Sequence, residues 1–133
     1  MPDKESALKD EIIKIGQRLY QAHLVAARSG NLSCRLDNDY ILITATGASL
    51  NDLKEEDILK VNLNSEVDTR NERLTTEFPL HSQIHKNFNH KTVIHCHPPL
   101  VNGYFAVYSD LRVLTFETKL HLGKVPVIQQ ETP

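Results

Sequence analysis

The 133-residue sequence predicts one domain that mixes helices and strands, an α/β or α+β sandwich. Three observations support this prediction: an amphipathic helical stretch near the N-terminus, a strand–turn–strand segment after it, and short helical and strand patterns in the second half. A chain of this length can bury one ordinary hydrophobic core. No internal repeat, low-complexity tract or Gly/Ser-rich linker divides it.

The first helical pattern follows a charged N-terminal tail. Four aliphatic residues recur at intervals of three and four, which places them along one stripe of an α-helix. They are Leu8, Ile12, Ile15 and Leu19. We expect the helix to stop near Gly30, because glycine is typical of the residue just past a helix C-terminus.

A β-hairpin and a third strand come next. Residues 32–36 and 40–44 have strand patterns and flank the Asp-Asn-Asp cluster at 37–39, which predicts a hairpin with a three-residue turn. Residues 53–57 predict one charged helical turn. Alternation of apolar and polar residues over 59–63 then predicts a third strand.

A second helix is predicted from residue 78 to about residue 88. Pro79 is acceptable in its first turn, because the N–H that proline lacks has no intrahelical partner there. We expect its buried stripe to comprise Leu80, Ile84 and Phe88, which recur at intervals of four.

Three further elements are predicted after that helix. The β-branched segment at residues 92–97 predicts a short strand that closes at Pro98-Pro99. Residues 100 to about 108 predict a helix, and residues 125–128 predict another strand.

Composition and charge exclude several classes of protein. The sequence has 15 Lys and Arg against 17 Asp and Glu, a formal net charge of −2, which argues against general nucleic-acid binding. It contains no run of 18 apolar residues, so we expect no membrane span. The N-terminus lacks an apolar signal-peptide core, and two cysteines are no disulfide framework. We therefore expect a cytoplasmic protein.

Histidine is over-represented, and the sharpest local feature is a His-x-His pair. His95 and His97 lie two apart on the predicted strand, so both imidazoles project from one face. Such a pair suits zinc or another divalent transition metal such as nickel or cobalt. The alternative is two strand histidines bonded to backbone or carboxylate partners. Cys96 points to the opposite face, which favours a packing role over ligation.

A second candidate is the Thr75-Thr76-Glu77 segment at the start of the predicted second helix. Free backbone N–H groups and the helix dipole make this position a natural anion site. The alternative is ordinary capping by a threonine hydroxyl. Beside a metal ion, Glu77 could ligate it or exchange a proton with a substrate carbon.

Two small-residue turns, Ser29-Gly30-Asn31 and Thr46-Gly47, complete the candidates. Each offers backbone N–H groups and polar side chains that could contact phosphate oxygens, although similar turns are common. His81 and His85 lie four apart on the predicted second helix. Without a His-Glu-x-x-His pattern around them, surface or supporting roles are favoured over a metal pair.

Taken in order, four segments resemble the class II aldolase/adducin family: Ser29-Gly30-Asn31-Leu32-Ser33, Thr46-Gly47, Thr75-Thr76-Glu77 and His95-Cys96-His97-Pro98. The resemblance runs from about Glu5 to the last residue. It implies a three-layer α/β/α sandwich with a mostly antiparallel central sheet, in which residues 1–133 form a single domain. It also implies a homotetramer with sites between subunits.

The resemblance further implies the role of each site residue. His95, His97 and Glu77 correspond to zinc ligands, and Glu77 also to the catalytic acid/base. His81 matches a supporting histidine. The substrate-phosphate site corresponds to Gly30, Asn31, Thr46, Gly47, Thr75 and Thr76.

The implied activity is that of a zinc-dependent aldolase, which cleaves a ketose 1-phosphate to dihydroxyacetone phosphate and an aldehyde. Alternatives within the family are a non-catalytic, adducin-like assembly domain, a methylthioribulose-phosphate dehydratase and a pentulose-phosphate 4-epimerase. The family's third zinc histidine follows a Val-Pro-Val-like strand. Here Val125-Pro126-Val127 is followed by only six residues, so we expect a C-terminally truncated domain that holds metal more weakly.

Overall fold

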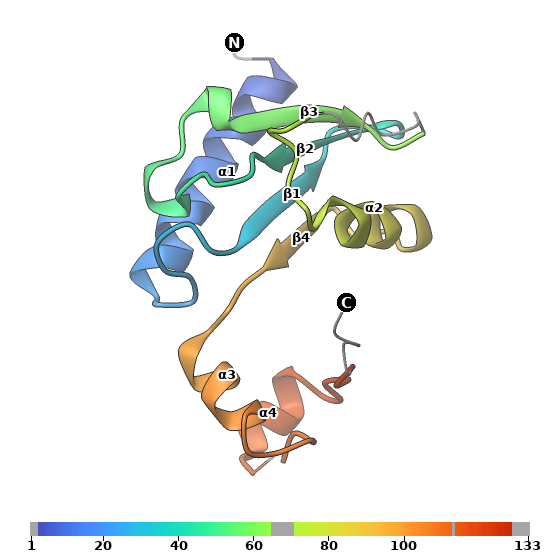
Figure 1. Cartoon of the computed structure of the whole chain (residues 1–133). Coiled ribbons are helices and arrows are strands. Elements are labelled where there is room, and N and C mark those ends of the chain that lie inside the picture. Colours follow the sequence, from blue (N-terminus) through green and yellow to red (C-terminus); the bar gives the residue numbers. More distant parts are fainter. Residues whose placement is uncertain (1–2, 65–70, 113, 129–133) are drawn as a thin grey trace. The chain divides into compact units, whose positions relative to one another are not determined.

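The computed structural model describes residues 3–64, 71–112 and 114–128 (Figure 1). The chain divides into two compact units, Met1–Pro98 and Pro99–Pro133, and the expectation of a single domain stays a prediction. The first unit contains α1 (Lys4–Gln21), β1 (Asn31–Arg35), β2 (Tyr40–Thr44), the 3-10 turns η1 (Leu50–Asp52) and η2 (Glu55–Asp57), β3 (Ile58–Asn62), α2 (Phe78–Asn87) and β4 (Thr92–His95). The second contains α3 (Pro99–Phe105) and α4 (Phe116–His121).

The four strands form one antiparallel sheet in the order β3-β2-β1-β4. The predicted hairpin is confirmed, with Ser33 opposite Ile43 on β2 and opposite Val93 on β4. The predicted third strand is also confirmed, one residue earlier than expected. β1 therefore lies inside the sheet, with a hydrogen-bonded neighbour on each side.

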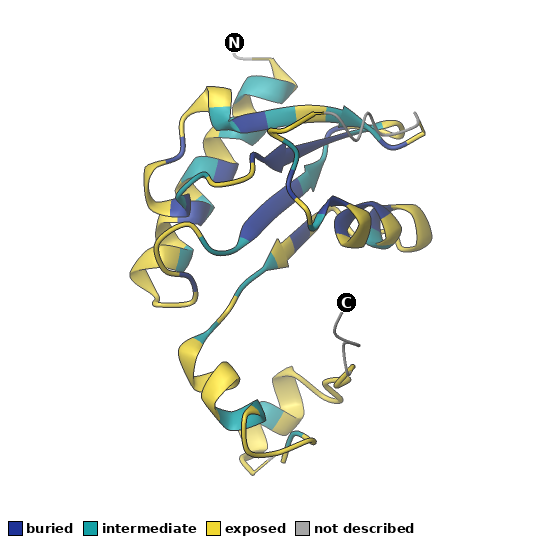
Figure 2. Ribbon diagram, in the orientation of Figure 1, coloured by how far each residue is buried: buried dark blue, intermediate teal, exposed yellow. Residues whose placement is uncertain are grey.

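Helices cover both faces of this sheet, which confirms the three-layer α/β/α arrangement of the first unit (Figure 1). Ile12 of α1 packs with Leu32 and Leu42 in one core cluster. Phe78 of α2 packs with Ile41 and Ile43 in the other. Neighbouring residues of a strand thus supply opposite cores, as the two-residue period requires. Figure 2 shows the buried residues concentrated on the inner strands and on the sheet-facing side of α2.

Helix α1 ends at Gln21, so the expectation that it would stop near Gly30 is wrong. His23 adopts φ 57°, and the Leu24 N–H donates to the Leu19 carbonyl over 3.0 Å. This is a Schellman termination, in which a left-handed residue reverses the chain. Histidine occupies a position where glycine is the usual sequence signal, so the earlier ending was not predicted.

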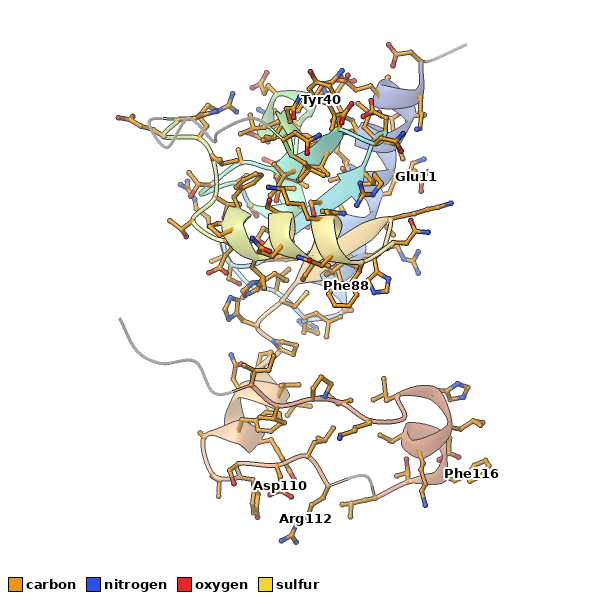
Figure 3. The ribbon with its side chains drawn as sticks, turned by 90° about the vertical axis from the view of Figure 1, so that its right-hand side faces the viewer. Glu11, Tyr40, Phe88, Asp110, Arg112 and Phe116 are labelled. Carbon is orange, nitrogen blue, oxygen red and sulfur yellow. The ribbon has the colours of Figure 1, made fainter. Side chains whose placement is uncertain are left out.

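The second helix has the predicted position but not the predicted buried face. Leu80 and Phe88 are 47% and 59% exposed, and Ile84 is half-buried. Figure 3, which views the molecule from the α2 side, shows Phe88 at the end of this helix. The residues that α2 buries are Phe78, His81, Ser82 and His85. Polar side chains on β1 account for this choice, as described below.

Other boundaries differ from the sequence prediction. β4 ends at His95, two residues before the predicted end. The predicted charged turn at residues 53–57 is the 3-10 turn η2, and η1 before it was not predicted. Residues 125–128 form no strand. They have no strand partner within the described residues, and Pro126 has no N–H to donate to one.

The second unit is mostly exposed (Figure 2). Its first helix is shorter than predicted, and α4, which was not predicted, is capped by the Thr115 hydroxyl accepting from the Thr118 N–H over 3.1 Å. The Tyr104 hydroxyl donates to the Asp110 carbonyl and accepts from the Arg112 N–H, which ties α3 to the loop after it. In the described ranges of the chain, no helix is both long and apolar enough to cross a membrane.

Candidate active site

The candidate site lies on the face of the sheet that α2 covers. Asn31, Ser33 and Arg35 alternate along β1 with the apolar residues that face α1. Asn31 pairs with His95 on β4, and directly opposed residues of an antiparallel pair share a face. The strand register therefore brings a predicted phosphate residue beside a predicted metal ligand.

The two histidines of the His-x-His pair converge, as predicted. Nε2 of His95 lies 2.9 Å from Nε2 of His97, with ring centroids 4.6 Å apart. Zinc–nitrogen bonds of about 2.0–2.1 Å at tetrahedral angles imply a nitrogen–nitrogen separation of about 3.3 Å. A shared divalent ion thus requires only a small adjustment of these rings.

Glu77 lies at the start of α2, where its backbone is the N-cap and its side chain makes no capping hydrogen bond. Oε2 of Glu77 lies 3.6 Å from Nδ1 of His95, the ring nitrogen that does not face His97. Within the described residues, no three His, Cys, Asp or Glu side chains form a cluster with metal-site geometry. The role of Glu77 as a direct ligand therefore stays a prediction.

The two threonines before Glu77 differ in their surroundings. Thr75 is buried, and its hydroxyl accepts a 3.3 Å hydrogen bond from the Glu77 N–H. Its carbonyl accepts from the Phe78 N–H over 3.0 Å. Thr76 is exposed. The Thr75 hydroxyl thus binds the N–H of the N-cap residue rather than a donor of the first turn, and the exposed Thr76 is open to solvent.

Both predicted glycine turns adopt positive φ, 80° at Gly30 and 70° at Gly47. A Cβ on Gly30 would meet Val25 Cγ1 at 2.6 Å and the His95 carbonyl oxygen at 2.9 Å. The space beside Gly47 is open, and its nearest group is Nη1 of Arg28, 4.0 Å from the Cβ position. The sequence analysis did not identify Arg28 as a candidate. Its positive charge beside a predicted phosphate-binding turn is the only sequence feature that indicates such a role.

A buried chain of polar side chains joins β1 to α2. Ser33 Oγ lies 2.7 Å from Nδ1 of His81 and 2.8 Å from Nε2 of His85, and Nε2 of His81 is hydrogen-bonded to Oδ1 of Asn31. Ser33 and His81 are completely buried, and His85 and Asn31 nearly so. These four residues, Asn31, His81, Ser33 and His85, are called the polar chain below.

Burial favours the neutral form of both histidines of the polar chain. It lowers the pKa of His81 to about 4, with smaller contributions from His85 and His95. Burial, and secondly the charge of Arg35, lowers the pKa of His85, while the His90 backbone opposes that shift. Arg35 also donates from Nη2 to the His85 carbonyl, a favourable cation position at a helix C-terminus.

The sequence analysis missed this chain. It left His81 and His85 at the surface or in supporting roles, and their burial against the sheet excludes only the surface alternative. One sequence feature could have indicated the polar chain. Ser33 lies two residues after Asn31 on a predicted strand, so both side chains are expected on one face. The remaining histidines, His23, His90 and His121, are exposed.

An antiparallel sheet between two helices, with a histidine pair at the end of β4, is the fold of class II aldolases. Residues 10–133 match the class II aldolase and adducin N-terminal domain, and the chain belongs to this family.

Individual relatives extend this result. The chain is 32% identical over 118 residues to an L-fuculose phosphate aldolase of Methanocaldococcus jannaschii, covering 88% of this chain and 64% of the relative. It is 32% identical over 102 residues to a methylthioribulose-1-phosphate dehydratase of Xanthomonas campestris, covering 76% of this chain and 47% of the relative. The crystal structure of L-fuculose-1-phosphate aldolase from Thermus thermophilus superimposes with a TM-score of 0.81 at 28% identity, over 95% of this chain and 64% of that one. The chain thus spans less than two thirds of each.

Proposed function

We propose that this chain carries the metal and phosphate sites of a sugar-phosphate aldolase, which cleaves a ketose 1-phosphate to dihydroxyacetone phosphate and an aldehyde. The observation that carries the proposal is the convergence of His95 Nε2 and His97 Nε2 at 2.9 Å with the Glu77 carboxylate beside them. The aldolase relatives support it. The proposed substrate is a phosphorylated sugar, and the proposed assembly is a cytoplasmic homotetramer.

The donor set suits a divalent transition metal. Two imidazole nitrogens and one carboxylate match the ligand preferences of zinc, with other divalent transition metals as substitutes. His95, His97 and Glu77 would hold the ion. When bound, it would supply Lewis-acid stabilisation of the negative charge that carbon–carbon cleavage leaves on the substrate oxygens.

The chain's own residues have two tasks in this reaction. Glu77, whose side chain is 42% exposed, is accessible to substrate and would carry the proton to and from the reacting carbon. The turns at Gly30-Asn31 and Thr46-Gly47, with Thr76, would hold the phosphate and fix the orientation of that carbon. Thr75 supports the backbone of Glu77 through its hydroxyl.

The test is to supply the zinc-loaded protein with a panel of ketose 1-phosphates, including L-fuculose 1-phosphate, and to measure dihydroxyacetone phosphate release. We expect release from wild type and loss in Glu77→Gln, with His121→Ala as an exposed-histidine control. Consumption of methylthioribulose 1-phosphate without this product would instead identify a dehydratase. If folded, metal-loaded protein consumes neither substrate class, the aldolase proposal fails and the non-catalytic assembly alternative replaces it.

A further inference from the structure

We infer that His85, Ser33 and His81 act as positioning residues that fix the side-chain amide of Asn31, so that its Nδ2 group donates to a phosphate oxygen of the substrate. This inference rests on the proposed role of Asn31 in phosphate binding. The geometry that supports it is the unbroken polar chain from α2 to β1.

The order of protons along the polar chain follows from what each atom can do. Oδ1 of Asn31 only accepts, so Nε2 of His81 carries a hydrogen and donates to it. A neutral imidazole has a single N–H, which leaves Nδ1 of His81 as an acceptor. The Ser33 hydroxyl therefore donates its hydrogen to that nitrogen, across 2.7 Å.

The last link is then determined as well. With its own hydrogen committed to His81, Ser33 Oγ can only accept from His85, whose Nε2 must carry the hydrogen across 2.8 Å. This order follows from the Asn31–His81 link, in which Oδ1 of Asn31 can only accept.

The consequence falls on Asn31. Because His81 presents an N–H, rotating the amide by half a turn would set two donors against each other. Nδ2 of Asn31 thus points away from His81, and the described residues provide it with no hydrogen-bond partner. Among the described residues, it is not one of the buried side-chain atoms that lack a partner. Nδ2 is therefore accessible on the face that carries His95.

The first experiment measures the histidine tautomers of the wild-type chain by long-range ¹H–¹⁵N correlation at neutral pH. We expect Nε2–H tautomers for both His81 and His85. Nδ1–H tautomers for both would reverse the proton order and overturn the inference. This measurement requires no variant, so it remains decisive even where a substitution in the polar chain prevents folding.

The second experiment follows the Asn31 side-chain amide resonances while inorganic phosphate is titrated. We expect Ser33→Ala to weaken phosphate binding roughly 3- to 10-fold, the loss expected for one hydrogen bond. Ser82→Ala, which removes another buried hydroxyl of the α2 interface, should leave the affinity unchanged. Equal losses in Ser33→Ala and Ser82→Ala would indicate a merely structural effect and contradict the inference.

The Asn31→Ala variant tests separately whether Asn31 binds phosphate and whether Ser33 acts through Asn31. If this variant binds phosphate as wild type does, Asn31 is not a phosphate residue and that part of the proposed function fails, whatever the tautomers. If Asn31→Ala weakens binding and adding Ser33→Ala causes no further loss, the two residues act as one unit, as inferred. Fully additive losses would show that Ser33 does not act through Asn31.

Discussion

Glu77 Oε2 lies 3.6 Å from Nδ1 of His95, whereas Nε2 of the same ring lies 2.9 Å from Nε2 of His97. A carboxylate beside the outer nitrogen of a metal-ligating histidine orients the ring and raises its basicity. From this position, Glu77 would influence the metal affinity proposed for the histidine pair through the orientation of His95.

Glu77→Gln should therefore lower zinc affinity about 10- to 100-fold, the range for partners of ligating histidines. The His95→Ala, His97→Ala double variant should lose the site, and His121→Ala serves as the control. Competition with a chelator of known affinity measures each value. Equal metal content in wild type and the double variant would contradict the assignment of the histidine pair.

Phe78→Ala should destabilise the fold by about 3–5 kcal/mol, because it empties a buried position between α2 and the sheet. Leu80→Ala, two residues further along the same helix, should change stability by no more than about 0.5 kcal/mol, because that side chain is 47% exposed. Urea unfolding followed by circular dichroism compares the two. Similar losses of stability in the two variants would support the buried face of α2 that the sequence predicted.

Gly30→Ala should destabilise more than Gly47→Ala. Both positions have positive φ, so each substitution incurs a left-handed penalty of about 1–2 kcal/mol. Only at Gly30 does the added Cβ also collide with Val25 and with the His95 carbonyl. Thermal unfolding of the matched pair measures the difference, and equal losses would show that the space around Gly30 relaxes freely.

Stability should fall as the pH is lowered from about 6.5 toward 4. The folded state holds His81 neutral with a pKa of about 4 against an ordinary 6.5, so in this window the unfolded chain binds the extra proton. His81 accounts for a loss of up to about 3 kcal/mol, and the lowered pKa of His85 acts in the same direction.

Urea unfolding at pH 7 and pH 5 tests this dependence. His81→Gln should flatten it, while His121→Gln, at an exposed position, should not. Between pH 7 and pH 5 the lowered pKa values of Glu5 and Asp37 contribute little, because their ordinary values are 4.5 and 3.8 and both carboxyls are ionised in either state. An unchanged slope in His81→Gln would assign the pH dependence to other groups.

Much of the fold could be predicted from the sequence, because its patterns have fixed periods. Alternation with a period of two identified β1 and β3, and the aliphatic stripe identified α1. The end of α1 escaped prediction because His23 adopts a left-handed conformation without the usual glycine. The buried face of α2 escaped it because apolar residues are expected inside, whereas here the sheet presents Ser33 to the helix.

The candidate site divides in the same way. The histidine pair could be predicted, because a separation of two residues in extended chain places both rings on one side, and the rings converge although β4 ends at His95. The polar chain depends on contacts between Ser33 and residues 48 and 52 positions later. No local pattern specifies such a pairing, because it arises only when α2 packs across β1.

The alternation of β1 between a polar and an apolar face also protects the pairing of the sheet. A shift of β1 by one residue would exchange its two faces, turning Leu32 toward the histidines and Ser33 into the apolar layer beneath α1. All hydrogen bonds of Ser33 would then be lost together, and both histidines would remain buried without partners, each at a cost of about 1–3 kcal/mol. The polar chain adds little net stability to the fold, yet it favours the observed register of β1 over registers shifted by one residue.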